Sequence, residues 1–166
     1  ENTRAVSFSG NTFGGALSVE GGTASVKGCE FKNNTARYGG AIHLGLAGLE
    51  GKTIGSMKLE DSTITGAVAT ARGGGVHVYN ANSTKQTLEM INTDVIDCVA
   101  PDGGGIGLFG CSNTIITGGT IKNCSADATK GYGGGLYIKS GGTMENCSIG
   151  GNSAGNTGGG FRMDAK

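Results

Sequence analysis

The chain has 166 residues, which suits one domain, and 35 of them are glycine, about three times the usual share. Thirteen Lys and Arg balance thirteen Asp and Glu without a basic cluster, so we expect no nucleic-acid partner. No apolar run approaches the roughly 18 residues of a membrane span, so the sequence predicts no transmembrane segment.

The glycines recur in one motif, in which two or three small residues precede an apolar-x-apolar triplet. Six copies occur, beginning at Gly14, Gly39, Gly73, Gly103, Gly133 and Gly158. Their first glycines are 25, 34, 30, 30 and 25 residues apart, and a period of this size indicates a repeat architecture. We therefore predict that the leading glycines form corners of the repeat. The corner glycines at the centre of the chain are Gly39, Gly40, Gly73, Gly74, Gly103, Gly104, Gly133 and Gly134.

Three short strands are predicted in each repeat, in chain order. The first follows the glycines, as at Leu17 and Val19, and the second alternates apolar and polar residues, as at Ala24 and Val26. The third is centred on an apolar anchor residue. The anchors are Phe8, Phe31, Ile64, Val95, Ile121 and Ile149. Alternation with a period of two is typical of a strand buried on one face, whereas no glycine-free stretch of ten residues has helical periodicity.

Two further columns are in register with the anchors. Alanine stands five residues after five of them: Ala36, Ala69, Ala100, Ala126 and Ala154. Asparagine stands three residues after three of them: Asn11, Asn34 and Asn152. The alanines indicate that equivalent residues stack along a narrow interior. The asparagines are expected at tight turns, where Asn tolerates left-handed dihedrals and stacked amides form a hydrogen-bonded ladder.

These patterns predict an all-β fold, a right-handed parallel β-helix of about five to six coils, each with three short strands, and no substantial helix. The handedness follows the general rule for parallel crossovers. Residues 1–166 are expected to form one β-helix segment, excised from or continuing into a longer repeat protein.

Two coils also carry a recognisable pair of motifs. Phe8-Ser9-Gly10-Asn11 precedes Gly14-Gly15-Ala16-Leu17, and Phe31-Lys32-Asn33-Asn34 precedes Gly39-Gly40-Ala41-Ile42. This pairing resembles the FxxN and GGA[ILV] motifs of the polymorphic outer-membrane protein repeat family, within the broader pectin-lyase-like β-helix class. The resemblance implies a surface-exposed, adhesin-like autotransporter passenger, and hence an extracellular or cell-surface location.

Binding residues are expected among the middle residues of the glycine strands, which we predict to form an outward, solvated stripe. His43, His77, Tyr137 and Arg162 are the candidates, together with two long loops at 45–56 and 79–87. His43 and His77 should lie about one strand spacing apart, but no third ligand is evident, so we predict no metal and no cofactor. The expected partner is a host-surface protein or a glycan, and Tyr137 is expected to be free to meet it.

Two other functions remain open. A β-helix polysaccharide lyase or hydrolase would need clustered carboxylates, and Glu30, Asp61, Asp94 and Asp97 are the nearest to such a cluster. Because no complete catalytic arrangement is visible, we predict a non-enzymatic protein. Alternatively, bare coil ends could stack on neighbouring coils or copies and build a filament.

Cysteines and sequons give weaker signals. The five cysteines lack CxxC spacing, so most are expected to be small inward-facing residues, with Cys98 and Cys124 as stacked thiols. Four N-glycosylation sequons occur, at Asn33, Asn82, Asn123 and Asn146.

Overall fold

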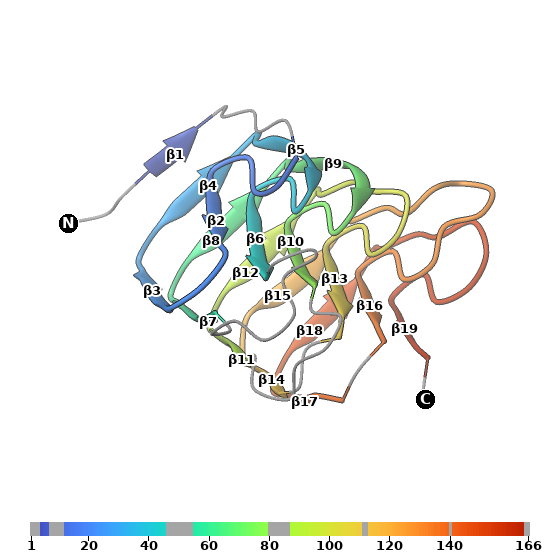
Figure 1. The fold of residues 1–166 in the computed structure, drawn as a ribbon. Helices are drawn as coiled ribbons and strands as arrows, with labels where there is room; N and C mark the ends of the chain where they lie inside the picture. Colours follow the sequence, from blue (N-terminus) through green and yellow to red (C-terminus); the bar gives the residue numbers. More distant parts are fainter. Residues whose placement is uncertain are drawn as a thin grey trace.

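The computed structural model describes residues 4–6, 12–45, 55–79, 87–110, 113–139 and 141–164. Within them, every strand pair is parallel, and the chain winds through three sheets in turn, as a β-helix does (Figure 1). No helix occurs in this part of the chain, and therefore none that could cross a bilayer. The predicted all-β parallel solenoid without substantial helix is confirmed.

The three sheets have six, six and five described strands, close to the expected number of coils. Sheet I contains β1 (Arg4–Val6), β4 (Glu30–Lys32), β8 (Thr63–Thr65), β12 (Asp94–Ile96), β15 (Thr120–Lys122) and β18 (Ser148–Gly150). Sheet II contains β2 (Leu17–Val19), β6 (Ile42–Gly45), β10 (Val76–Tyr79), β13 (Ile106–Phe109), β16 (Leu136–Ile138) and β19 (Phe161–Met163). Sheet III contains β3 (Thr23–Lys27), β7 (Ser56–Glu60), β11 (Thr87–Ile91), β14 (Asn113–Thr117) and β17 (Thr143–Glu145). A short pair, β5 (Thr35–Tyr38) and β9 (Val68–Arg72), lies between sheets I and II in the coil.

The core is the lumen of the solenoid, where the predicted apolar columns meet. Ile42 and Leu44 of sheet II, Leu59 of sheet III and Ile64 of sheet I have no exposed surface and belong to one continuous cluster. Each such side chain contributes roughly 1.5 to 3 kcal/mol when fully buried, so stability depends on stacking several coils.

Left-handed residues recur at three corners of each coil. The first glycine of every motif has a positive φ, between 53° and 72°. A second corner has Gly28, Asp61, Asn92, Gly118 and Asn146, and a third has Asn33, Gly66, Asp97, Asn123 and Gly151. Gly, Asn and Asp are the residues that tolerate this conformation, so the corners follow directly from the sequence.

The second glycine is required for a different reason, which is close backbone packing. A Cβ added at Gly74 would lie 2.0 Å from the Gly104 carbonyl oxygen and 2.6 Å from the Val99 nitrogen. Gly40 and Gly104 meet the same obstruction in their own coils. The first glycine of each pair therefore takes the left-handed conformation, and the second leaves room for the neighbouring backbone.

The asparagine column is in a different place from the one predicted. Asn34 and Asn152 do not have positive φ, and the residues before them, Asn33 and Gly151, take the left-handed position. Asn34 is fully buried, and the Asn152 amide accepts a hydrogen bond from the Cys124 N–H at 2.8 Å and donates one to the Ile121 carbonyl at 2.9 Å. The column faces inward because the left-handed residue before it shifts the alternation of sheet I by one residue, so that Phe31 and Asn34 are both buried while Asn33 is exposed. Asn11 lies outside the described residues.

The alanine column stacks as predicted. Ala36 pairs with Ala69, and both are buried, as are Ala100 and Ala126, whereas Ala154 in the last coil is partly exposed. The column lies beside the main apolar cluster and lines a groove of about 520 Å³ under the corner segments that include Pro101 and Asp127.

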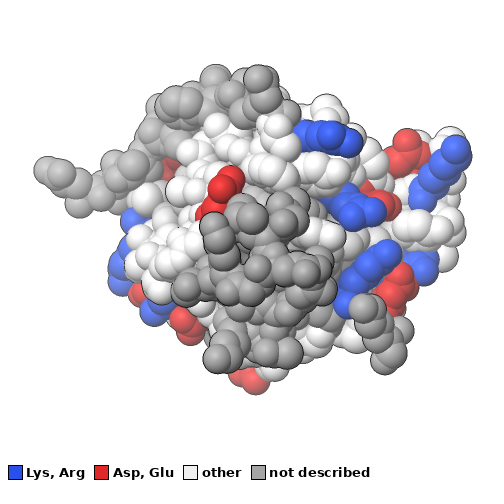
Figure 2. All heavy atoms as spheres, viewed as in Figure 1, with Lys and Arg blue, Asp and Glu red and all other residues white. Residues whose placement is uncertain are grey.

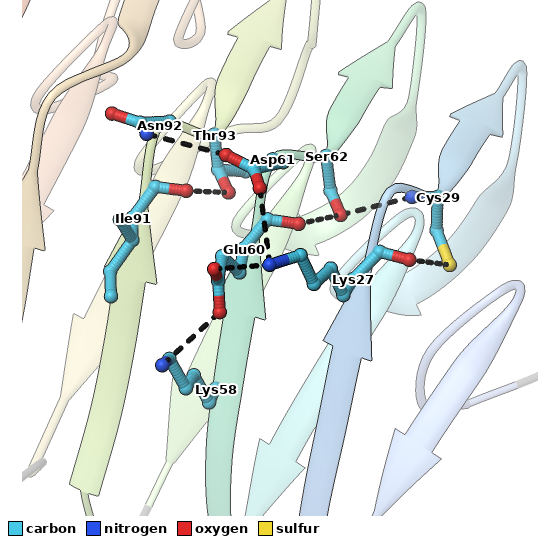
Figure 3. A network of polar contacts seen from close by, with 9 residues as sticks. All are labelled: Lys27, Cys29, Lys58, Glu60, Asp61, Ser62, Ile91, Asn92 and Thr93. Atoms are coloured by element: carbon cyan, nitrogen blue, oxygen red, sulfur yellow. Dashed lines mark hydrogen bonds and ion pairs between the residues drawn. The ribbon is translucent and has the colours of Figure 1, made fainter. Parts of the chain in front are cut away.

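A polar ladder closes the corner between sheets III and I (Figure 3). The Ser62 hydroxyl donates to the Glu60 carbonyl at 2.8 Å and accepts from the Cys29 N–H at 3.1 Å, and Thr93 donates to the Ile91 carbonyl at 3.0 Å. This explains why the sequence has small residues at this corner. On the outside, Lys27 pairs with Glu60 at 2.7 Å.

The last described coil leaves its apolar side chains open. Phe161 and Met163 are 46% and 50% exposed, whereas Leu136 and Ile138, their partners in the preceding coil, are 0% and 3% exposed. None of the described residues therefore covers this end of the lumen.

Candidate functional site: the outer face of sheet II

The outer face of sheet II carries three parallel rows of side chains. The central row is the predicted stripe: Ser18, His43, His77, Gly107, Tyr137 and Arg162, in direct register. A corner row consists of the residues directly before each glycine motif: Phe13, Tyr38, Arg72, Asp102, Tyr132 and Thr157. An outer row follows each strand of the central row and includes Tyr79, Phe109, Lys139 and Asp164.

The expectation of a solvated stripe is wrong for most of the central row. His43, His77 and Tyr137 are only 0%, 1% and 2% exposed. Aromatic residues of the flanking rows account for this, because Phe13 packs 4.5 Å from the His43 ring and Tyr38 packs 5.2 Å from the His77 ring. Tyr137 is therefore not free to meet a partner. The accessible surface is formed by Arg162 and by the flanking rows, except for Phe109, which is buried.

Gly107 interrupts the central row, and Phe109 fills the space. A Cβ at Gly107 would come within 2.9 Å of the Phe109 ring. That ring lies 5.5 Å from His77 on one side and 5.1 Å from Tyr137 on the other, the latter edge to face. Phe109 thus joins two otherwise separate pairs, His43 with His77 and Tyr137 with Arg162, into one continuous aromatic band.

The two histidines form a close buried pair. Their rings stack with centroids 5.1 Å apart, and the Nδ1 atoms lie 3.0 Å apart, so that one N–H donates to the other nitrogen. Burial lowers the pKa of His43 to about 4, partly opposed by a backbone hydrogen bond at Gly45. The pKa of His77 is also lowered well below its ordinary value, first by burial and then by the charges of His43 and Arg72. Both imidazoles are therefore neutral at pH 7.

Tyr137 and Arg162 meet at one carboxylate. The Tyr137 hydroxyl donates to Asp164 Oδ2 at 2.7 Å, and Arg162 Nε donates to Asp164 Oδ1 at 2.7 Å. Hydrogen bonds from Tyr137 and Arg162 lower the pKa of Asp164. Burial, and then the hydrogen bond to Asp164, raise the pKa of Tyr137. This triad is a fixed polar structure with its charges satisfied.

Cationic groups lie over the aromatic rings. The Arg72 guanidinium is 4.5 Å from the Phe109 ring centroid, Lys139 is 5.2 Å from that of Tyr137, and Arg162 is 4.0 Å from that of Tyr132. Arg37 lies 5.3 Å from the Tyr38 ring. Figure 2 shows Lys and Arg side chains, with Asp and Glu side chains beside them, on the side of β13, β16 and β19. The face therefore combines aromatic surface with positive charge.

A small cavity opens in this face. It has a volume of about 200 Å³ and is lined by Phe13, Tyr38, Arg72, His77 and Tyr79. Its lining residues are mainly aromatic, and those that carry polar groups are two tyrosines, one histidine and one arginine.

The other predicted site features lie partly outside the described residues. Of the two long loops, residues 46–54 and 80–86 lie outside the described residues, as do Asn82 and Cys111. The sequons at Asn33, Asn123 and Asn146 are exposed corner residues. Cys98 and Cys124 are buried free thiols, and Cys29 and Cys147 are partly buried free thiols. No group of three His, Cys, Asp or Glu residues that could hold a metal occurs in the described ranges.

The carboxylates considered for catalysis are spread along the solenoid. Glu30, Thr63 and Asp94 are in register on three successive strands of sheet I, so the two acids are two strands apart. The Asp94 carboxylate accepts the Thr120 N–H at 2.8 Å, and Asp61 accepts a hydrogen bond from Asn92 at 3.3 Å. These acids have structural hydrogen bonds and do not converge on one point.

Sequence reasoning identified the central row but missed the rows on either side of it. The signal was available, because the residue before each glycine motif is Phe, Tyr, Arg, Asp, Tyr or Thr, and an aromatic or charged residue follows most of the glycine strands. Outward positions on adjacent strands had to be considered together to find it.

Comparison with known proteins agrees with this architecture. A family model described as right handed beta helix region matches residues 47–165, most of the chain. The chain therefore belongs to the right-handed β-helix family, and the predicted handedness is confirmed. Neither the curated proteins nor the solved structures contain a match to this chain.

Proposed function

We propose that this chain is a non-enzymatic, extracellular β-helix stalk of an adhesin-like surface protein, and that the outer face of sheet II binds acidic glycans. The surface location is inferred from the paired FxxN and GGA[ILV] motifs of the first coils, which resemble the polymorphic outer-membrane protein repeats. The binding role rests on one observation, the band of aromatic rings with cations lying over them.

The chemistry of this band suits a sugar with negative charge. The partly exposed aromatic rings of the flanking rows provide apolar contact for the carbon-bound hydrogens of a sugar ring, and guanidinium groups pair with carboxylate or sulfate oxygens. Those rings belong to Phe13, Tyr38, Tyr79 and Tyr132. Arg72 is partly exposed and Lys139 is exposed, so their charges are accessible from solvent.

The carboxyl groups favour a non-enzymatic role. Glycoside cleavage needs an acid whose pKa is raised so that it holds a proton near neutral pH. Where the pKa of a described carboxyl group is clearly shifted, at Glu60, Asp127 and Asp164, the direction is downward, and hydrogen bonds to the ionised form are the main cause.

Affinity electrophoresis in gels containing acidic or neutral polysaccharides tests this proposal. We expect acidic polysaccharides to retard the protein more than neutral ones, and Lys139→Gln to reduce the retardation. Lys122→Gln is the matched control, because Lys122 is also an exposed lysine but lies on β15 of sheet I. Equal loss in both variants, or no retardation by any acidic polysaccharide, would contradict a specific face on sheet II.

The exposed end of the lumen supports a second candidate, a filament subunit that stacks end to end. Phe161 and Met163 present apolar surface where another coil could pair with β19. If this is correct, electron microscopy should reveal filaments that Met163→Glu abolishes. Discrete monomers at high concentration would rule the filament out.

A further inference from the structure

We propose that the cavity lined by Phe13, Tyr38, Tyr79, Arg72 and His77 binds a single ring that carries one carboxylate. This inference deepens the proposed function and rests on it, since it names the part of an acidic ligand that the face recognises.

The size and walls of the cavity select one ring. At about 200 Å³ it is smaller than the 300 Å³ or more of a typical drug-sized site. Phe13 and Tyr38 are stacked, with centroids 5.6 Å apart, and Tyr79 lies 6.2 Å from the His77 ring in a nearly parallel orientation. A flat ring can therefore contact an aromatic wall without moving the backbone.

The charge of the cavity selects an anion. Aromatic cages of this kind bind organic cations when nothing positive lines them, but here Arg72 is part of the lining. Its guanidinium is held only loosely by Asp102, with the nearest nitrogen and oxygen 3.9 Å apart, and it is partly exposed. Donors therefore remain available for a carboxylate, which Arg pairs with in a bidentate geometry.

One residue of the cavity lining has a polar atom without a partner. His77 is 1% exposed, and its Nδ1 is hydrogen-bonded to His43, so Nε2 is the ring nitrogen that remains unpaired. That Nε2 is buried and has no hydrogen-bond partner. In the tautomer in which His77 Nδ1 accepts from His43, Nε2 carries the hydrogen. Since a buried polar group without a partner costs free energy, a ligand oxygen that accepts a hydrogen bond from this N–H would satisfy it.

Isothermal titration calorimetry with four small probes tests the inference. Sodium glucuronate and sodium benzoate carry the ring and the carboxylate, while glucose and benzyl alcohol carry a ring without charge. We expect at least one acid to bind in the millimolar range or tighter, about tenfold or more tighter than its neutral partner. Binding of glucuronate alone would identify an acidic sugar as the source of the ring, and binding of benzoate alone would identify a free aromatic acid.

Arg72→Gln should weaken binding of the acid about tenfold, whereas Arg37→Gln should not, because Arg37 is an exposed cation next to Tyr38 that does not line the cavity. Thermal melting checks that each variant folds, and the acid-to-neutral comparison on the unmodified protein needs no variant. Equal binding of acid and neutral probes, an equal effect of the two substitutions, or no binding at all would overturn the inference. Retardation of the protein by acidic polysaccharides without binding of any probe would overturn this inference alone and leave the proposed function standing.

Discussion

The side chains on the outer face of sheet II owe their properties to the neighbouring coils. His43 and His77 would be ordinary surface residues on an isolated strand, but stacking places Phe13, Tyr38 and Phe109 around them. The sequence predicted that the two histidines are adjacent. It could not reveal their burial, because burial depends on side chains from positions 13, 38 and 109, which only the register of the coils brings together.

Burial of this pair predicts acid sensitivity. With a pKa of about 4 in the folded chain and an ordinary value of about 6.5 when unfolded, His43 binds a proton more readily in the unfolded state. The stabilisation is complete at pH 7 and is lost as the pH falls from about 6.5 towards 4, by roughly 3 kcal/mol. Urea unfolding across this range measures the loss.

His43→Gln is the control for that measurement, since it cannot take up the proton and should make the stability less dependent on pH. If the unmodified protein is equally stable at pH 7 and pH 4.5, the histidines are solvated after all.

The left-handed conformation of the corner glycines predicts a loss of stability when one of them is replaced. Gly73 has a φ of +63°, and an added Cβ would lie 2.3 Å from the Val76 carbonyl oxygen. Gly73→Ala should therefore cost at least about 2 kcal/mol of unfolding free energy. Gly150→Ala is the matched substitution, because nothing lies within 4 Å of that position and its φ is not positive. Similar midpoints in urea for both variants would mean that the corner is misassigned.

At the scale of the strands, alternation and corner residues were sufficient to predict most of the structure. The anchors, the glycine strands and the alanine column all lie where the spacing places them. Asn34 and Asn152 were predicted at the left-handed corner, but the corner residue is the one before each of them. Asn suits both a left-handed corner and an inward hydrogen bond to the backbone, and the residue type alone does not distinguish the two roles.

The polar ladder at the corner between sheets III and I gives a prediction about stability (Figure 3). Ser62 is 2% exposed and bonds the Cys29 N–H and the Glu60 carbonyl, so Ser62→Ala leaves both without this partner. We expect a loss of about 1 to 3 kcal/mol in chemical denaturation. Ser148→Ala, at an exposed position on β18, should change stability little. A stable Ser62→Ala protein would show that the ladder does not hold the corner.

At the scale of the whole molecule, the repeated motif determines the fold, whereas the function depends on the side chains that the coils carry on their outer surface. The period and the glycine motif were enough to predict a right-handed parallel β-helix. The face that we propose for binding was only partly predictable, since one of its three rows of side chains was recognised. A solenoid makes function hard to predict from motifs, because its sites are assembled across coils from residues roughly 30 positions apart.

The most direct test of a non-enzymatic binding stalk is an assay for cleavage of the polysaccharides that bind. The protein should be incubated with each acidic polysaccharide that retards it, and new reducing ends and unsaturated products should be measured over time. The account predicts binding without product. Product that accumulates with the unmodified protein and disappears in Asp94→Ala and Glu30→Ala would contradict it and identify the chain as an enzyme.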